Sequence, residues 1–454
     1  MTTTAATTAT STSTGSARPI PALGPARVAE LPAVAERTLG NGLRVLVVRR
    51  PGVPLAELRL RVPFSGRGVD HVATAQLLGD TLLMGTQRRS AGQLAADLQA
   101  LGGSLSASVD SDKLAFGGSV LQAGLPGLLE LLAEVLTQAS YPDREVEGER
   151  DRLVQELAIY RSQAGVVARE ALLSRMYADH PYGRELPTAQ AVQAVAAPAL
   201  RDLHAARVAP EGSVLVLVGD LSPEAALDEV ESRLAGWTAR GAASVAPPLP
   251  EPPVGPALLL DRPGAVQTTV RLSGRAPRRT DPDHPAFTLA NLVLGGYFSS
   301  RWVANIREDK GYTYSPHSGV DHPQAGSRVT LAADVATGVT APALLETWYE
   351  LGRMVTLPVS QEELDQARRY AIGSLALSTS SQAGLAGTLS ALTASGLGVQ
   401  WLRDSPQALA GVTVEQVLDA AARYLVPERL TCVLVGDAEQ VEGPVSRVLR
   451  VVRE

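Results

Sequence analysis

The sequence repeats itself at a distance of about half its length, and this duplication constrains the fold more than any other feature. Three short patterns recur in the same order, at offsets of 212, 213 and 217 residues: Arg50-Pro51-Gly52 with Arg262-Pro263-Gly264, Asp70-His71 with Asp283-His284, and Val218-Gly219-Asp220 with Val435-Gly436-Asp437. Any one match could arise by chance, but three in order at a nearly constant offset indicate an internal duplication. The 454 residues therefore predict two homologous domains, each long enough to bury its own core.

Each repeat combines short alternating strands with longer helices. Residues 55–62 and 267–272 alternate between polar and apolar side chains, as strands with one covered face do. Ser90 predicts the start of a helix that runs to Leu101, Ser222-Pro223 predicts another start, and residues 142–163 predict a long amphipathic helix. The predicted class is α+β, with two domains that are each a largely antiparallel sheet, backed by helices on one face and open to water on the other.

The expected boundaries follow shifts in composition. Residues 241–256 are rich in proline and predict a semi-rigid linker between an N-terminal domain at 36–240 and a C-terminal domain at 257–454. Residues 1–35 are rich in Thr, Ala, Ser and Pro and predict a disordered tail. Because this tail has no charge before Arg18 and no compact apolar core, it does not resemble a secretory signal, and we expect a cytoplasmic protein. An organelle-targeting peptide stays open as an alternative, because the tail has no acidic residue before Glu30.

The composition argues against several classes of partner. The 41 basic and 47 acidic residues give a net charge of -6 without a basic run, so no nucleic-acid partner is expected. No apolar stretch approaches the roughly 20 residues of a membrane helix, so no membrane partner is expected either. The single cysteine, Cys432, lies in an apolar run and is interpreted as a buried strand residue.

The second half carries the most specific motif. It consists of Gly295-Gly296-Tyr297-Phe298-Ser299-Ser300-Arg301, followed by Arg307-Glu308-Asp309-Lys310-Gly311-Tyr312-Thr313-Tyr314-Ser315. This pattern closely resembles the C-terminal signature of the pitrilysin/insulinase zinc peptidases, especially their bacterial and mitochondrial-processing-peptidase branch. Three patterns of the first half resemble that family in the expected order: Met84-Gly85-Thr86 at the end of the metal helix, Gly102-Gly103 before a strand, and His180-Pro181-Tyr182-Gly183. The resemblance covers about residues 36–450.

The resemblance also shows what is missing. Active members bind zinc through H-x-x-E-H on a helix, where the histidines are ligands and the glutamate is the base, and a later carboxylate completes the site. Counted back from Gly85-Thr86, the histidine positions are Gln76 and Asp80, and the glutamate position is Gly79. Only Glu156 stands where the third ligand would be, with Glu149 seven residues before it.

We therefore predict no metal site in this chain. Glutamine is a poor zinc ligand, glycine cannot accept a proton, and no two of the six histidines are four residues apart. A replacement site built on Asp80 and Glu156 stays open as an alternative to solvated or hydrogen-bonded carboxylates. His180 is interpreted as the cap of a helix end and not as a ligand.

The resemblance implies a role for the second half. In the family, an arginine and a tyrosine seven residues apart reach across the chamber to the zinc site; here they are Arg307 and Tyr314. A guanidinium and a phenol aimed at the carbonyl oxygen stabilise the negative charge that develops there. The simpler interpretation pairs Arg307 with a nearby acid and makes Tyr314 a strand residue. Substrate contacts are expected from Gly295, Gly296, Ser299 and Ser300.

The resulting hypothesis is a division of labour between two chains. This chain would be the non-catalytic subunit of a heterodimeric zinc endopeptidase, with Arg307, Tyr314 and half of the chamber, but without a cofactor of its own. A homologous partner with an intact H-x-x-E-H motif would bring the zinc, and short unfolded peptides would be the substrates. Three alternatives stay open: a structural core-type protein, a substrate-binding subunit like that of the mitochondrial processing peptidase, and a self-associating peptide-binding chamber without catalysis. The Gly295-Gly296-Tyr297 segment is too short and bulky to match the glycine-rich loop of that processing-peptidase subunit well.

Overall fold

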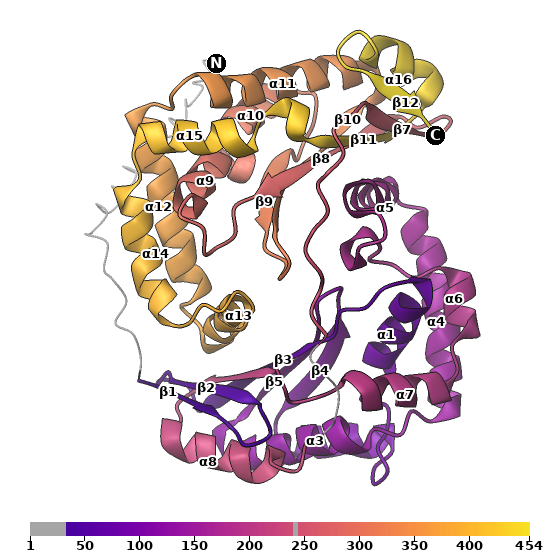
Figure 1. Cartoon of the computed structure of the whole chain (residues 1–454), viewed down its shortest axis with the longest axis vertical. Coiled ribbons are helices and arrows are strands. Elements are labelled where there is room, and N and C mark those ends of the chain that lie inside the picture. Colours follow the sequence, from indigo (N-terminus) through magenta and orange to yellow (C-terminus); the bar gives the residue numbers. More distant parts are fainter. Residues whose placement is uncertain (1–32, 239–243) are drawn as a thin grey trace, which may run out of the picture.

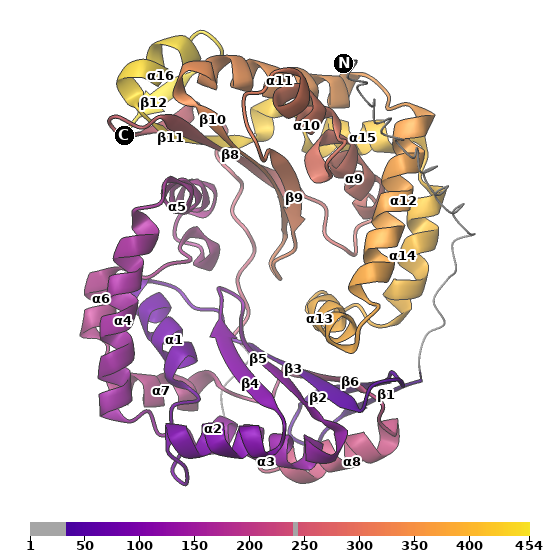
Figure 2. The ribbon, with the colours of Figure 1, turned by 180° about the vertical axis from the view of Figure 1, so that it is seen from behind.

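The computed structural model describes residues 33–238 and 244–454, and its elements form two similar halves around two sheets (Figure 1). Nearly all of the predicted tail, residues 1–32, and the first part of the predicted linker, residues 241–243, lie outside the described residues. The two sheets lie on opposite sides of the middle of the molecule, and both views show helices on their outer sides (Figures 1 and 2).

The described part of the first half, residues 33–238, contains six strands and eight α-helices. Its strands are β1 Val34–Thr38, β2 Arg44–Arg49, β3 Leu55–Pro63, β4 Ser104–Val109, β5 Lys113–Leu121 and β6 Val214–Gly219. Its helices are α1 Val69–Thr81, α2 Ala91–Ala100, α3 Leu125–Gln138, α4 Asp143–Arg161, α5 Ala164–Tyr177, α6 Ala189–Ala194, α7 Ala197–Arg207 and α8 Pro223–Leu234.

The second half repeats this order of elements. Its strands are β7 Ala257–Asp261, β8 Gln267–Ala276, β9 His317–Asp321, β10 Ser327–Ala336, β11 Thr431–Gly436 and β12 Val451–Arg453. Its helices are α9 His284–Asn291, α10 Arg301–Val303, α11 Thr340–Thr356, α12 Gln361–Ser378, α13 Gln382–Thr393, α14 Gln400–Gly411, α15 Val414–Tyr424 and α16 Ala438–Val445. Two π-helical segments, Leu292–Gly296 and Ala304–Asp309, flank α10.

The strand order confirms two homologous α+β domains. The first sheet runs β1-β2-β6-β3-β5-β4 and the second runs β12-β7-β11-β8-β10-β9, so five strands correspond in chain order and position. The edge strand differs, because β1 precedes its sheet in the chain and pairs antiparallel with β2, whereas β12 ends the chain and pairs parallel with β7. Most of the other pairs are antiparallel, as the alternating sequence patterns predict.

The duplication extends to side-chain hydrogen bonds within the sheets. Arg59 on β3 donates to the carbonyl of its preceding residue, Leu58, at 2.7 Å and to that of Gly118 on β5 at 3.1 Å. Arg271 on β8, 212 residues later, donates to the carbonyl of Val270 at 2.9 Å and to that of Ala333 on β10 at 3.1 Å. The same side chain therefore bridges the same two strands in both halves.

The predicted helix starts follow from their caps. Ser90 accepts a hydrogen bond from the Gln93 amide, and the Gln93 side chain accepts one from the Ser90 amide, which forms a capping box at the start of α2. Ser222 precedes α8, whose first residue is Pro223. The long helix predicted at 142–163 is α4, Asp143–Arg161.

The inner sheet faces differ from the sequence prediction, because helices of the opposite half cover part of them. Helix α5 of the first half packs on β8 and β11, while α13 of the second half packs on β3 and β6, as both views show (Figures 1 and 2). Leu385, Leu389 and Leu392 of α13 form a buried cluster with Val216 and Val218 of β6. The prediction of a water-facing side was wrong for these central strands, whose apolar residues point both ways and need cover on both faces.

None of the described helices is long and apolar enough to cross a membrane.

Candidate functional site

The first candidate site lies on α1, where the sequence predicts a degenerate metal motif. Gln76 and Asp80 are one turn apart, and the Gln76 amide donates to both oxygens of the Asp80 carboxylate, at 3.1 and 3.2 Å. Burial raises the pKa of Asp80, while the hydrogen bond from Gln76 and the charge of Arg152 lower it in part. The helix ends at Thr81, so Met84-Gly85-Thr86 follows the helix and does not form its last turn.

The Val109 side chain crowds the position of the catalytic glutamate at Gly79. A Cβ atom at Gly79 would lie 2.9 Å from Cγ2 of Val109, at the end of β4. Real Cβ atoms essentially never come that close to another heavy atom, so any side chain here requires Val109 to move. A side chain at this position therefore fits only after the Val109 side chain shifts.

A guanidinium group stands among the remaining acids of this site. Arg152 on α4 donates through Nε to Glu149 at 2.6 Å and through Nη1 to Glu156. These two hydrogen-bonded carboxylates raise the pKa of Arg152. Glu149 and Glu156, two acids that could have attracted a metal cation, thus share one cation of the chain itself.

These residues do not fit a zinc ion. Asp80 is held by Gln76, and Glu156 is held by Arg152. Within residues 33–238 and 244–454, no group of three or more His, Cys, Asp or Glu residues is arranged to hold a metal ion. Glu149 and Glu156 are the two acids of an Arg152-centred ion-pair network on one helix face.

The second candidate site lies in the C-terminal half, around Arg307. The Cζ atom of Arg307 lies 4.3 Å from the centroid of the Phe298 ring and 5.1 Å from that of the Tyr314 ring. Both rings are exposed, with 63% of Phe298 and 82% of Tyr314 accessible, and Glu308 lies 3.3 Å from the Arg307 Nε. The guanidinium of Arg307 therefore lies against two aromatic rings. The exposed Tyr314 beside it is accessible to another molecule.

The backbone around this pair is locally fixed. Arg307 lies in the π-helical segment Ala304–Asp309, and such segments are frequent at functional sites. The Tyr312 amide donates to the Ile306 carbonyl at 2.8 Å, and the Thr313 hydroxyl donates to the Asp334 carbonyl at 2.7 Å. Tyr314 follows in the loop before β9, so it is not a strand residue.

The four predicted substrate-contact residues differ in accessibility. Gly295 is buried, and a Cβ atom added to it would lie 2.9 Å from the Ser318 hydroxyl oxygen. Ser300 is also buried, just before the start of α10. Gly296 is partly exposed and Ser299 is exposed. A substrate can reach only the latter two without rearrangement of the chain, so Gly295 and Ser300 serve the packing of this segment.

The two candidate sites open into different cavities. Gln76 lines a cavity of 800 Å3 between the two halves. Arg307 and Tyr314 line a separate hollow of 630 Å3 in the second half. The chain therefore does not bring its degenerate motif and its Arg/Tyr pair to one site.

The His180-Pro181-Tyr182-Gly183 motif joins the two halves. His180 accepts a hydrogen bond from the Tyr182 amide at 3.1 Å and caps a short helical turn, as the sequence predicts. The Tyr182 hydroxyl donates to Asp112 in the β4–β5 loop and accepts from the Ala325 amide in the β9–β10 loop at 2.9 Å. Burial and the neighbouring Asp112 charge raise the pKa of Tyr182 well above its ordinary value, so the phenol stays protonated and can donate.

Comparison with known proteins identifies the family. The family model described as insulinase (peptidase family M16) matches residues 70–190, and the one described as peptidase M16 inactive domain matches residues 194–370. An uncharacterized zinc protease of Mycobacterium bovis is 30% identical over 307 residues, which cover 66% of this chain and 70% of the relative. The chain belongs to the insulinase family, peptidase family M16.

Further relatives of this chain show a similar likeness. An uncharacterized zinc protease of Mycobacterium leprae is 30% identical over 293 residues, or 63% of this chain and 66% of that protein. The chain thus spans about two thirds of the length of these mycobacterial relatives. A probable mitochondrial-processing peptidase subunit beta of Arabidopsis thaliana is 23% identical over 197 residues, or 43% of this chain and 37% of that subunit.

Solved structures of similar chains support the fold of this insulinase-family member. A crystal structure described as a peptidase M16 inactive domain from Pseudomonas fluorescens matches with a TM-score of 0.82 and 25% identity, over 89% of this chain and 98% of that chain. A protease from Helicobacter pylori matches with a TM-score of 0.80 and 18% identity, over 90% of this chain and 100% of that chain. The sequence contains no H-x-x-E-H motif, the zinc-binding pattern of this class of peptidases.

The sequence interpretation missed several residues of these sites. Arg152 could have been found from its spacing, three residues after Glu149 and four before Glu156, which places all three on one helix face. Phe298 stands inside the second-half motif, but nothing in the sequence shows that its ring meets Arg307. The partners of Tyr182 come from loops 70 and 143 residues away, so no local pattern could indicate them.

Proposed function

We propose that this insulinase-family chain is the non-catalytic subunit of a heterodimeric zinc metalloendopeptidase that hydrolyses short, unfolded peptides. The observation that carries the proposal is the contrast between the two candidate sites. The metal motif is replaced by Gln76, Gly79 and Asp80 and crowded by Val109, whereas Arg307 and Tyr314 lie together and the Tyr314 side chain is exposed. Arg307 and Tyr314 place a guanidinium and an accessible phenol side by side, which are the two donors that the proposed role needs.

The proposed role follows from the chemistry of peptide hydrolysis. A homologous partner with an intact H-x-x-E-H motif would hold the zinc ion, which activates water and polarises the scissile carbonyl. Tyr314 would donate its hydroxyl hydrogen, and Arg307 its guanidinium hydrogens, to the oxygen on which negative charge develops. Phe298 would keep the guanidinium in place, because its ring covers one side of Arg307. Gly296 and Ser299 would contact the peptide backbone nearby.

The two separate cavities of the chain support action in trans. Arg307 and Tyr314 do not line the cavity that contains Gln76, so they are not directed at the motif of their own chain. Tyr314 is 82% exposed, which leaves its hydroxyl available to a second chain. The proposed complex therefore has one zinc-bearing half and one half that supplies donors and chamber wall.

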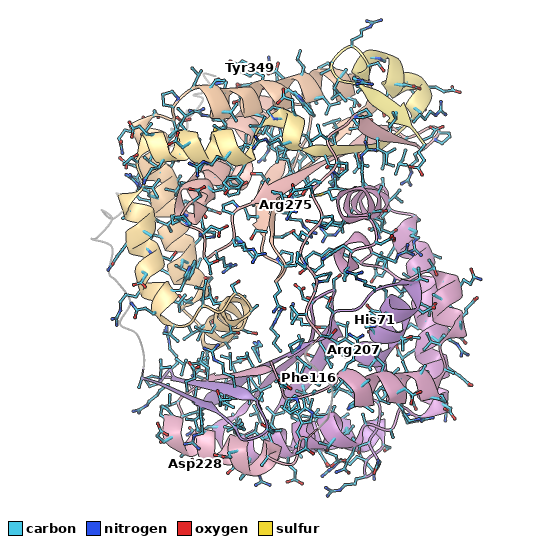
Figure 3. All side chains as sticks on the ribbon, viewed as in Figure 1. His71, Phe116, Arg207, Asp228, Arg275 and Tyr349 are labelled. Carbon is cyan, nitrogen blue, oxygen red and sulfur yellow. The ribbon has the colours of Figure 1, made fainter. Side chains whose placement is uncertain are left out.

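The test is a Tyr314→Phe substitution in the reconstituted complex with the H-x-x-E-H partner. The phenylalanine keeps the aromatic face beside Arg307 and removes only the hydroxyl, so we expect kcat to fall by about 10²–10³ with a small change in KM. Tyr349→Phe is the matched control, because Tyr349 on α11 is also an exposed tyrosine beside an arginine, with Arg353 Cζ 5.6 Å from its ring centroid, and lies on the outer side of the molecule (Figure 3). Equal kcat for both variants would remove Tyr314 from the mechanism.

A further inference from the structure

The cavity between the two halves contains a buried arginine without an acidic partner. Arg61 on β3 is 8% exposed and lines this 800 Å3 cavity. Its Nη2 donates to the Gln324 side chain at a long distance of 3.4 Å. No carboxylate forms an ion pair with it in the described parts of the chain, although Asp112 and Asp110 influence it from farther away.

A second arginine of the same cavity, Arg279, has even fewer partners. Its Nε is buried without a hydrogen bond among the described residues, and its Cζ lies 5.7 Å from the centroid of the Trp401 ring. His284 and His322 are its titratable neighbours, and burial together with the Arg279 charge lowers their pKa values to about 4 and about 3. Both histidines are therefore neutral at pH 7, so they add no second positive charge beside Arg279 and supply no negative one.

The other cations of the cavity wall are already paired. Arg169 binds Glu185 through two hydrogen bonds of 2.6 and 2.9 Å. Arg328 pairs with Asp321 at 3.0 Å, and Lys113 pairs with Asp110. Asp112, which also lines the cavity, accepts hydrogen bonds from the Gln324 amide at 2.8 Å and from Tyr182. The described cavity wall thus has five cations and four acids, a net charge of one positive unit, and neither Arg61 nor Arg279 forms an ion pair with any of these acids.

Two unpaired, largely buried guanidinium groups cost the fold stability. Burial lowers the pKa of both Arg61 and Arg279, which is the sign of a charge that has lost water without full compensation. Such groups persist where a ligand supplies the missing charge, since guanidinium groups match carboxylates with paired hydrogen bonds. The volume of the cavity lies within the range of ordinary ligand sites.

We propose that Arg61 and Arg279 bind the carboxylate of a peptide inside the cavity between the two halves. The anionic class of the ligand follows from the unpaired charges, whereas its peptide nature rests on the function proposed above. The carboxylate belongs either to the C-terminus of the peptide or to an acidic side chain. Gln76 lines the same cavity, so the degenerate metal motif borders the proposed binding site.

The test measures binding of three N-acetylated hexapeptides of Ala and Ser to the isolated chain by ligand-observed NMR. One has a free C-terminal carboxylate, one is amidated, and one is amidated with a single internal Glu. At least one of the two peptides with a carboxylate is expected to bind more tightly than the neutral peptide, by about tenfold or more. The peptide that binds shows whether the carboxylate comes from the C-terminus or from an acidic side chain. Equal binding of all three, or binding of none, would overturn the proposal.

Substitutions assign the effect to the two arginines. Arg61→Gln and Arg279→Gln should each weaken binding of the charged peptide by about tenfold or more, the loss of a charge-assisted hydrogen bond. Lys113→Gln is the matched control, because Lys113 lies in the same wall but its charge is already paired with Asp110. This substitution should weaken peptide binding by less than about threefold. Unchanged affinity in both arginine variants would contradict the assignment.

The variants also carry their own control for folding. Because the substitution removes an unpaired buried charge, Arg61→Gln should be at least as stable as the wild type. If Arg61 had a purely structural role, the same substitution would lower the stability of the chain. A clear drop in its melting temperature would therefore count against the proposal. All of these measurements use the chain without its partner, so they can fail while Tyr314→Phe still lowers turnover of the complex, and the reverse is equally possible.

Discussion

The hydroxyl of Tyr182 ties the two halves together, and Tyr182→Phe removes it without changing the ring. The ring packs edge-on against Tyr177 and His180, with centroid distances of 5.9 and 4.6 Å, and phenylalanine preserves both contacts. The substitution leaves the Ala325 amide without its 2.9 Å acceptor and takes one donor from the buried Asp112 carboxylate. Tyr182 and Asp112 are 3% and 7% exposed, so water cannot replace the lost partners without opening the loops.

The expected loss follows from these two contacts. A hydrogen bond to a charged group contributes about 1.5–3 kcal/mol, and a buried amide left without a partner costs about 1–3 kcal/mol. Because both contacts share one hydroxyl, the sum is smaller than two separate losses, and we expect about 2–4 kcal/mol in total. At about 1.4 kcal/mol per factor of ten, this corresponds to roughly 30- to 700-fold more frequent opening of the two loops.

Amide hydrogen exchange measures this opening directly. The Gln324 and Ala325 amides should exchange faster in Tyr182→Phe by that factor, whereas amides in the centre of β6 should change little. Tyr177→Phe is the matched control, because the buried Tyr177 hydroxyl has no hydrogen-bond partner among the described residues. Exchange at Gln324 and Ala325 that is the same in Tyr182→Phe as in wild type would refute the role of this hydroxyl.

Two further predictions concern charge. Arg152→Gln should lower the free energy of unfolding by about 1 kcal/mol or less, because Arg152 is half exposed, and the loss should shrink in high salt; a salt-independent loss in chemical denaturation would contradict an ion-pair origin. The pKa values of His284 and His322 are lowered to about 4 and about 3, so the unfolded chain takes up protons near pH 6.5 before the folded chain does. The contribution of these histidines to the free energy of unfolding is therefore fully present above pH 6.5 and is lost as the pH falls toward 4. For His284 this loss amounts to about 3 kcal/mol. Thermal unfolding between pH 7 and pH 4 should show a shallower decline in His284→Gln than in wild type, and identical declines would contradict this origin.

Much of the fold could be predicted because its signals are local or repeated. The Arg-Pro-Gly pattern at offset 212 precedes β3 and β8, which are central strands of the two equivalent sheets. Capping residues such as Ser90 fix helix starts through contacts within four residues. The Arg307 and Tyr314 spacing within a specific motif likewise led to two residues that the structure brings together.

The rest depends on contacts that are distant in the chain. Helix α13 covers the inner face of β3 and β6, although it lies more than 160 residues after β6 in the chain. The alternating pattern of β3 therefore could not show that the inner face of this strand is partly buried. The closure of Gly79 by Val109 and the role of Phe298 beside Arg307 also arise from tertiary packing. The unpaired state of Arg61 and Arg279 is a property of the whole cavity wall and has no sequence pattern.

Zinc content and peptide cleavage, measured on the purified chain alone and then on its complex with the H-x-x-E-H partner, test the division of labour most directly. The chain alone should bind no stoichiometric zinc and cleave no peptide, because Gln76, Gly79 and Arg152 leave no metal site. The complex should contain one zinc per pair of chains and cleave unfolded peptides. One zinc per chain together with peptide cleavage by the chain alone would contradict the account.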